Sequence, residues 1–348
     1  MASTSDFTAV PVFFRLIPSL RRPVGAVFVC LLALLCSGTT LTSAESRSFR
    51  LVVWNLRNYQ EADPLPTPAN WSPLGLEKEV PAALPKRGLS IPPKKKGAEE
   101  VKLLVETLVR LAPDVAALVE MGPPKPHLAS LQQRLALAGL NLPHALVVDG
   151  PDSDRHVVLL SAFPIKENLS VPWAEIAPAG SARYVSRGFL DAVIEPTPGQ
   201  PLHLWAVHLK SAHEEDMNPE TIRREEAITL RELLIAREMT QPKIPVLVVG
   251  DFNDDRASAS LKQIQGLTDG GEPHLNPLPL EDALGDHWTH YWNTEDAYTR
   301  IDFALANPAA RALVQKEGTF IERYPAAGEV SDHRPLVITL KLPAKKDD

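Results

Sequence analysis

The chain has 348 residues with 36 basic and 43 acidic side chains, which gives a formal net charge of −7; 44% of the residues are hydrophobic and 23% are charged. This composition is that of an ordinary globular protein and excludes a disordered or collagen-like chain, and the length fits one large domain or two ordinary ones. The only cysteines are Cys30 and Cys36, so a cysteine-rich zinc site and a disulfide framework are also excluded.

The first 44 residues have the pattern of a targeting segment. Three arginines between positions 15 and 22 precede an uncharged apolar run of 13 residues at 24–36. That run is shorter than the ~20 residues of a membrane-spanning helix but fits the apolar core of a signal peptide, and small residues at 42–44 offer a cleavage site. We expect export to the periplasm or the medium, with an uncleaved N-terminal membrane anchor as the alternative. Cleavage would change the net charge to −9, which argues against passive, charge-driven binding of nucleic acid.

Short apolar runs rich in β-branched residues recur after the leader and predict strands, several of them buried on both faces. These runs lie at 49–54, 115–119, 157–160, 189–194, 204–207, 246–249, 301–305 and 336–340. Apolar residues at helical spacing predict helices at 98–111 and at about 220–239. Strands mixed with fewer helices indicate an α/β or α+β sandwich.

Residues 60–97 break this pattern with eight prolines and end in Lys94-Lys95-Lys96-Gly97. The composition predicts a long loop or an insertion with little regular structure and little buried surface. The lysine run has two interpretations, a contact with a polyanion or a solvated, mobile loop.

Polar residues follow the predicted strands or stand at their ends. They are Asn55, Glu120, His208, Asp251, Asn253, Asp302, Asp332 and His333. Singly, each has an ordinary explanation; Asp251 to Asn253, for example, follow a glycine and can form a plain turn. As an ordered set they are placed to converge on one crevice. Carboxylates, amides and histidines without cysteine suit a hard, oxygen-preferring cation such as Mg²⁺.

The ordered set resembles the endonuclease/exonuclease/phosphatase superfamily of metal-dependent phosphoesterases, above all in Gly-Asp-Phe-Asn at 250–253 and Ser-Asp-His at 331–333. The resemblance runs from about residue 50 to 342. It implies one domain over 45–348, interrupted by the proline-rich insertion at 60–97. It also implies a four-layer αββα sandwich with two packed mixed β-sheets, of class α/β (α+β), whose active site lies at one edge.

The resemblance implies a metal site as well. Glu120 would be the main metal-binding carboxylate, and Asn55 and Asp332 would be its partners in holding the metal or orienting the phosphate. Mg²⁺ is the expected cation, with Mn²⁺ or Ca²⁺ as alternatives.

Five further residues receive catalytic roles from the same resemblance. Asp251 would orient or deprotonate the attacking water, and Asn253 would donate to the phosphate oxygens. His333 would contact the scissile phosphate while Asp302 fixes its tautomer. His208 would stabilise or protonate the leaving side.

Three arginines are candidate phosphate contacts. Arg57 stands where some branches of the superfamily carry an acidic residue, and Asn-Leu-Arg is similar to the secreted deoxyribonucleases, in which such an arginine grips the nucleic acid. Arg183 and Arg187 precede the predicted strand at 189–194, and they either contact phosphate or form surface salt bridges.

We therefore expect an exported, metal-dependent phosphodiesterase, with a nuclease as the first hypothesis. A phosphomonoesterase or a lipid phosphodiesterase of the sphingomyelinase or inositol-phosphate type is the alternative, and an inactive binding module is a remote one. The tryptophan that inositol phosphatases carry before the Gly-Asp pair is missing before Gly250. Nucleic acid or another phosphodiester is the expected substrate, and we expect a monomer without a stable protein partner.

Overall fold

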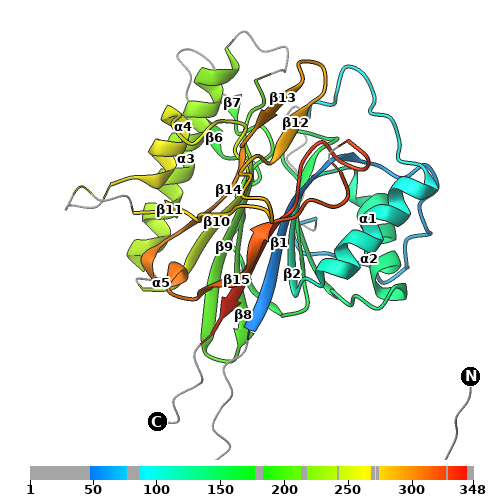
Figure 1. Ribbon diagram of the computed structural model, residues 1–348, viewed down its shortest axis with the longest axis horizontal. Helices are drawn as coiled ribbons and strands as arrows, with labels where there is room; N and C mark the ends of the chain where they lie inside the picture. The colour runs from blue at the N-terminus through cyan, green and yellow to red at the C-terminus, as the bar shows by residue number, and fades with distance from the viewer. Residues whose placement is uncertain are drawn as a thin grey trace, which may run out of the picture. The chain divides into compact units, whose positions relative to one another are not determined.

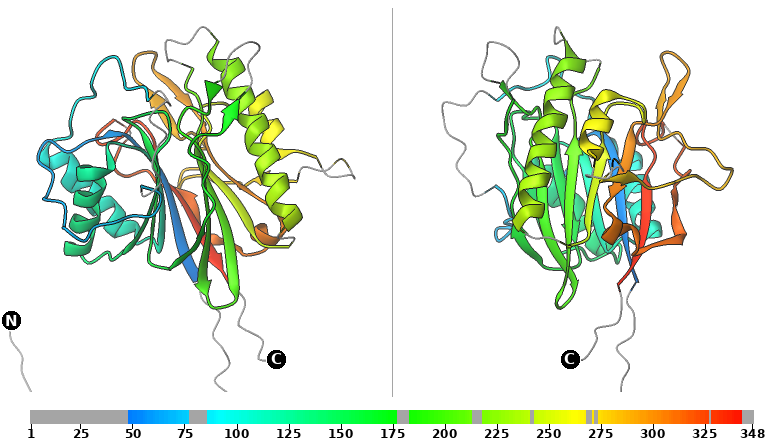
Figure 2. Two further views of the ribbon diagram at one scale, coloured as in Figure 1. Left: turned by 180° about the vertical axis from the view of Figure 1, so that it is seen from behind. Right: turned by 90° about the vertical axis from the view of Figure 1, so that its left-hand side faces the viewer.

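Two six-stranded mixed β-sheets pack face to face, and helices cover the outer face of each (Figure 1, Figure 2). The predicted leader at 1–44 lies outside the residues that this computed structural model describes. The described residues are 48–76, 86–176, 183–212, 218–240, 243–267, 271, 274–326 and 328–342. No helix among them is long and apolar enough to cross a membrane.

The first sheet and its helices consist of β1 (Ser48–Tyr59), β2 (Val115–Met121), β3 (His144–Val148), β4 (His156–Ser161), β15 (Val314–Ile321), β16 (Leu336–Lys341), α1 (Ala98–Leu111) and α2 (Pro124–Leu137). The strand order is β15-β16-β1-β2-β4-β3. Strand β1 runs antiparallel to β16 and parallel to β2, so the carboxyl ends of β1 and β2 reach the same edge of the sheet.

The second sheet and its helices consist of β5 (Ile165–Asn168), β8 (Leu190–Thr197), β9 (Gln200–His208), β10 (Val246–Asp251), β11 (Asn276–Pro277), β14 (Asp302–Ala306), α3 (Pro219–Thr240), α4 (Ala259–Gln265) and α5 (Pro308–Arg311). Its order is β11-β14-β10-β9-β8-β5, with β9 and β10 parallel. Two small ribbons stand apart from the sheets: β6 (Glu175–Ile176) with β7 (Arg183–Tyr184), and β12 (His290–Trp292) with β13 (Ala297–Thr299).

Strand β1 shows how the sequence builds the layers. Phe49, Leu51 and Val53 are buried between the two sheets, whereas Val52 and Trp54 are buried against α1 and α2. Successive side chains of a strand point to opposite faces, so a continuous apolar run suits a strand that is covered on both sides. The second sheet is covered in the same way, with α3 and α4 on its outer face. The predicted α/β (α+β) four-layer sandwich is confirmed.

All eight predicted strands and both predicted helices are present. The sequence pattern missed α2 because its buried face includes the polar residues His127 and Ser130, which obscure the helical period. It missed β15 because this edge strand is half-exposed and only Ile321 is buried.

The described parts of the proline-rich segment contain no helix or strand, as predicted. The prediction that it buries little surface is wrong at its ends, where Glu61 and Lys96 are both buried. Buried charge is costly unless it is paired, and Glu61 accepts hydrogen bonds from Tyr59, Ser130 and Arg134 at 2.7–2.9 Å. These contacts fix the start of the segment against β1 and α2.

Candidate active site

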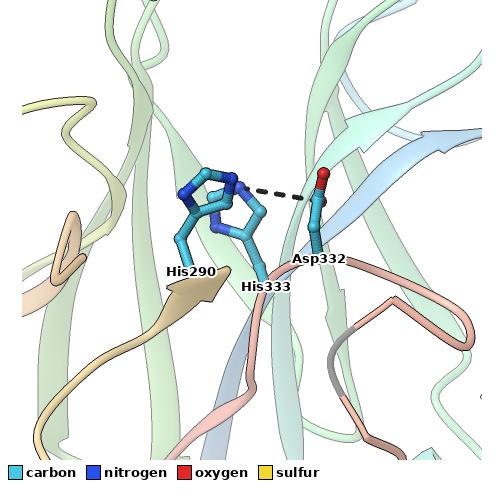
Figure 3. A group of neighbouring side chains, drawn as sticks. All are labelled: His290, Asp332 and His333. Atoms are coloured by element: carbon cyan, nitrogen blue, oxygen red, sulfur yellow. Dashed lines mark ion pairs between the residues drawn. The ribbon is translucent and has the colours of Figure 1, made fainter. Parts of the chain in front are cut away.

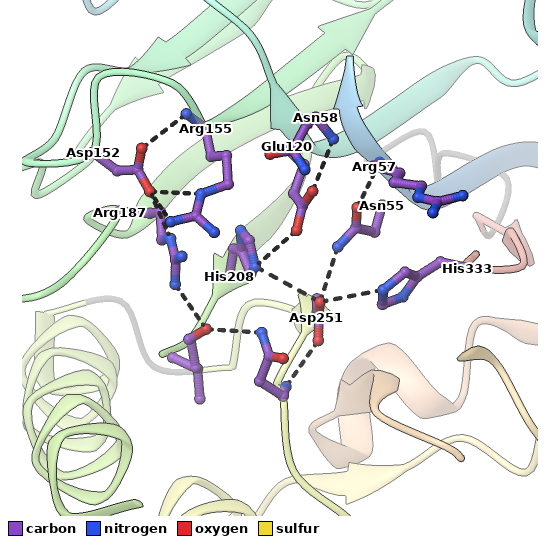
Figure 4. A network of polar contacts seen from close by, with 12 residues as sticks. Asn55, Arg57, Asn58, Glu120, Asp152, Arg155, Arg187, His208, Asp251 and His333 are labelled. Atoms are coloured by element: carbon purple, nitrogen blue, oxygen red, sulfur yellow. Dashed lines mark hydrogen bonds and ion pairs between the residues drawn. The ribbon is translucent and has the colours of Figure 1, made fainter. Parts of the chain in front are cut away.

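Four strand ends bring polar side chains together at one edge of the sandwich (Figure 4). Asn55 lies near the end of β1 and Glu120 near the end of β2 in the first sheet. His208 and Asp251 end β9 and β10 in the second sheet, and they pair directly with each other in the parallel register. Contacts between their side chains bring these four residues together at this edge, and their roles stay predictions.

The backbone bends where Asn55 and Glu120 present their side chains. The β1–β2 register shifts after Asn55, and Arg57, Asn58 and Glu120 have positive φ angles of 49°, 50° and 56°. Irregular strand pairing and left-handed residues re-aim side chains and concentrate at functional sites. Here the bend lets the Asn58 N–H donate to Glu120 Oε2 at 2.8 Å, which fixes this carboxylate.

Asp251 occupies the centre of the group. Its Oδ2 accepts a hydrogen bond from Asn55 Nδ2 at 2.9 Å, and its Oδ1 accepts one from the Asn253 N–H at 2.8 Å. Burial and the negative charge of Asp302 raise the pKa of Asp251 to about 7, although His333 and the Asn253 hydrogen bond act in the opposite direction. A carboxyl with a pKa near neutrality is suited to exchange a proton with water.

The approach of β10 to β9 at this point requires Gly250. A Cβ on Gly250 would lie 2.1 Å from the carbonyl oxygen of Val207, and its φ is +129°. Any side chain at position 250 would push Asp251 away from His208, which explains why the Gly-Asp-Phe-Asn motif begins with glycine.

His333 and Asp302 form a buried ion pair, with Nδ1 and Oδ2 2.8 Å apart. The loop that carries His333 is held by Ser331, whose hydroxyl donates to the Asn55 carbonyl at 2.7 Å and accepts from the His333 N–H at 3.1 Å. Burial by itself would lower the pKa of His333, but the charge and hydrogen bond of Asp302, with Asp251 and Asp332, raise it to about 10. The ring is therefore an imidazolium at neutral pH, with Nε2 3.8 Å from Asp251 Oδ2.

His208 has the opposite character. Its Nε2 lies 3.6 Å from Glu120 Oε1 and 3.7 Å from Asp251 Oδ2, and its Nδ1 has no hydrogen-bond partner among the described residues. Burial and the positive charges of Arg187 and Arg155 hold the pKa of His208 well below its usual range. The two histidines of the site therefore differ in charge at neutral pH.

Oxygen ligands for a cation are present on the open side. The side chains of Glu120 and Asp332 are 14% and 27% exposed, and the oxygens of Asn55 and Asp251 lie deeper. Asp251, Asp302 and His333 also lie with side-chain oxygen and nitrogen atoms within 4.8 Å of one another, and of these the two carboxylates offer ligand atoms while His333 is an imidazolium. Oxygen donors and imidazoles without cysteine suit a hard divalent ion, so these residues fit a metal site.

The three predicted phosphate arginines lie in different surroundings. Arg57 is 45% exposed and pairs with Asp332 at 3.3 Å. Arg187 is buried, not on the surface, and its Nε lies 3.2 Å from Asp152 Oδ2 beside His208. Arg183 lies on the separate ribbon β6–β7, so its phosphate role stays a prediction.

Sequence reasoning missed several residues of this edge. His290 packs on His333 with ring centroids 4.6 Å apart, and with Asp332 the two rings form a second group of possible ligands (Figure 3). Asp152 binds both Arg155 and Arg187 behind His208 (Figure 4). His290 stands in a short stretch rich in aromatic residues at 287–292, which is the one sequence signal that could have indicated it.

The sandwich and this edge define a phosphoester hydrolase of a metal-dependent class. The sequence profile of the Endonuclease/Exonuclease/phosphatase family matches residues 53–333, and the chain belongs to this family. The family expected from the resemblance is therefore confirmed, whereas the catalytic and metal-binding roles of the individual residues stay predictions. No curated protein sequence matches the chain.

Solved structures agree on the fold. An endonuclease/exonuclease/phosphatase family protein from Bacteroides thetaiotaomicron is 14% identical with a TM-score of 0.53, covering 88% of this chain and 100% of its own. The human Nocturnin catalytic domain with bound sulfate anion is 17% identical, covering 85% and 95%, with a TM-score of 0.53. D. rerio TDP2 complexed with single strand DNA product is 18% identical, covering 84% and 98%, with a TM-score of 0.50.

Proposed function

We propose that the protein is an exported, Mg²⁺-dependent phosphodiesterase that cleaves nucleic acid strands and acts as a monomer. The observation that carries the proposal is the pairing of two differently charged groups around one point. Asp251, with a pKa of about 7, and the His333 imidazolium lie side by side with Oδ2 and Nε2 3.8 Å apart, so a proton acceptor and a cationic donor can face the same phosphate.

Asp251 is the proposed proton acceptor for the attacking water. Its carboxylate is already held by Asn55 and by the Asn253 N–H, so a water beside Oδ2 would be oriented without rearrangement of the protein. His333 would donate from Nε2 to a nonbridging oxygen and offset the charge that develops there, because Asp302 accepts from Nδ1 and the raised pKa keeps both ring nitrogens protonated. The side-chain amide of Asn253 would donate a further hydrogen bond to the phosphate oxygens from the same side.

Glu120, Asn55 and Asp332 would hold the cation. When bound, the Mg²⁺ supplies positive charge to the phosphoryl oxygens, and Mn²⁺ or Ca²⁺ are alternatives with the same ligand preference. The side chains of Glu120 and Asp332 are both partly exposed, and carboxylate oxygens are the ligands that such a cation prefers, which supports this assignment.

His208 would act on the leaving side as a neutral imidazole. Its Nε2 faces Glu120 and Asp251, and its low pKa excludes the imidazolium as its resting form at neutral pH. We expect it to donate a hydrogen bond to the leaving oxygen rather than to deliver a stored proton.

A nucleic acid is favoured over a lipid because arginines lie at this edge although the chain is acidic overall. Arg57 is 45% exposed and is available to a strand, whereas Arg155 and Arg187 are held by Asp152 and contribute positive charge behind His208. Export is supported by the leader pattern in the sequence.

A substrate panel tests this proposal. The full-length protein with Mg²⁺ is assayed against single-stranded DNA, RNA, sphingomyelin, inositol phosphates and bis(p-nitrophenyl) phosphate. We expect strand cleavage, with His333→Ala as the inactive control. Turnover of sphingomyelin or inositol phosphates without cleavage of either nucleic acid would contradict it.

A further inference from the structure

A short segment near the active site has a charge opposite to that of the whole chain. Residues 86–96, which we call the basic strap, contain five basic residues and no acidic one, in a chain of net charge −7. It is the part of the proline-rich segment that returns toward α1. Its sequence alone leaves open whether it is a solvated loop or a contact surface.

One end of the strap is fixed to the loop behind His208. The Arg87 N–H donates to the Pro151 carbonyl at 2.7 Å, and the Leu89 N–H donates to Asp154 Oδ2 at 2.7 Å. The same loop contains Asp152, which binds the two arginines beside His208. This end therefore lies at the Glu120–His208 side of the site.

The other end is fixed to the loop of His333. Lys96 is buried, its N–H donates to the Gln60 carbonyl at 2.7 Å, and its Nζ donates to the Val330 carbonyl at 2.6 Å. Val330 directly precedes the Ser-Asp-His motif. The strap thus joins two loops that carry residues on opposite sides of the site.

Between these anchors the strap is open to solvent. Ile91 is 80% exposed, and Lys95 is exposed as well. The Lys94 side chain is 89% exposed and makes only a long contact, 4.0 Å from Nζ to Glu100 Oε2. Figure 1 and Figure 2 show this cyan segment arching at the same end of the sandwich as the orange β12–β13 ribbon. Pro92 and Pro93 restrict the backbone here, so the lysines project from an anchored and partly stiffened support.

We propose that the basic strap binds the part of a nucleic acid strand that continues beyond the scissile phosphate. This inference rests on the proposed function and narrows it to extended, multiply charged substrates. Lysine ammonium groups bind backbone phosphates as point charges without reading sequence, which suits a general nuclease. We expect a small phosphodiester to contact the reacting groups alone and a long strand to contact Lys94 and Lys95 as well, so that the strap distinguishes substrates by length.

The test is the double variant Lys94→Gln/Lys95→Gln in the full-length protein, and the matched control is Lys102→Gln/Lys262→Gln. The control removes two exposed lysines from the outer helices α1 and α4 and changes the net charge equally. Binding of a fluorescent single strand of about 20 nucleotides is measured by anisotropy in chelator at several salt concentrations, where the slope is about 0.7 per phosphate contact.

We expect the strap variant to bind the strand roughly 5–20-fold more weakly and to lose about 1.4 from the slope of log K against log salt, while the control stays near wild type. Turnover of bis(p-nitrophenyl) phosphate should be unchanged in both. Wild-type affinity and slope in the strap variant, or no binding by the wild-type protein, would overturn the proposal. Strap-dependent binding without cleavage in Mg²⁺ would uphold the strap and refute only the nuclease assignment.

Discussion

Asp302→Asn tests the buried pair that sets the charge of His333. The Asp302 carboxylate lies 2.8 Å from Nδ1 and is the largest cause that raises the pKa of His333 from an ordinary value of 6.5 to about 10. This rise corresponds to about 5 kcal/mol of preference for the imidazolium, since a change of one in pKa is about 1.36 kcal/mol. An amide of the same shape removes the charge and keeps the packing.

We expect Asp302→Asn to lower kcat roughly 10²–10⁴-fold, the range for positioned acid–base groups. The pH profile should change as well. The wild-type imidazolium persists into alkaline solution, whereas the His333 ring of the variant should lose its proton at lower pH. The alkaline limb of kcat/KM, measured with bis(p-nitrophenyl) phosphate and Mg²⁺, should therefore lie at lower pH in the variant.

Asp191→Asn is the matched control, because Asp191 and His203 form another buried carboxylate–histidine pair in the second sheet. His203 precedes His208 by five residues along β9, so at about 3.3 Å per residue the control pair lies about 16 Å from His208 and outside the site. The control should alter stability without moving the pH profile. A folded Asp302→Asn protein with wild-type turnover and an unmoved alkaline limb would refute the reasoning.

Three further predictions follow from the same geometry. Glu120→Gln should raise the Mg²⁺ concentration for half-maximal rate at least about tenfold, which a metal titration measures, because losing a charged ligand weakens a hard-cation site. The pKa of Asp251 is raised to about 7, so the fraction of Asp251 in the carboxylate form increases with pH and kcat/KM should rise between acid and neutral pH. Added Mg²⁺ should move this rise to lower pH, because a nearby cation favours the carboxylate; a kcat/KM that does not vary with pH would contradict this. Lys96→Met should destabilise the protein by about 1–3 kcal/mol in urea unfolding, because it leaves the buried Val330 carbonyl without its donor, whereas Lys95→Met should not.

Residues at the ends of doubly buried strands could be predicted from the sequence. Apolar runs without alternation indicated strands covered on both faces, and the polar residue that ends such a run must lie at a sheet edge. Asn55, Glu120, His208 and Asp251 were found in this way, and the structure brings them together. Local pattern was sufficient because each position is fixed by its own strand.

Residues whose role depends on a distant contact could not be predicted. Lys96 looks like its two lysine neighbours in the sequence, and it is distinguished only by the Val330 carbonyl, 234 residues away. The sequence around Arg187 does not distinguish it from a surface arginine, but it is buried and paired with Asp152, which lies 35 residues earlier. His290 acquires its contact only when β12 lies beside the His333 loop.

The most direct test of the account follows the oxygen of water into the product. A single-stranded oligonucleotide is incubated with the full-length protein in ¹⁸O-labelled water, first in chelator and then with Mg²⁺, and the products are analysed by mass spectrometry. We expect no cleavage in chelator, and with Mg²⁺ we expect one labelled oxygen in the terminal phosphate and none in the hydroxyl product. Cleavage that persists in chelator, or label in the hydroxyl product, would contradict it.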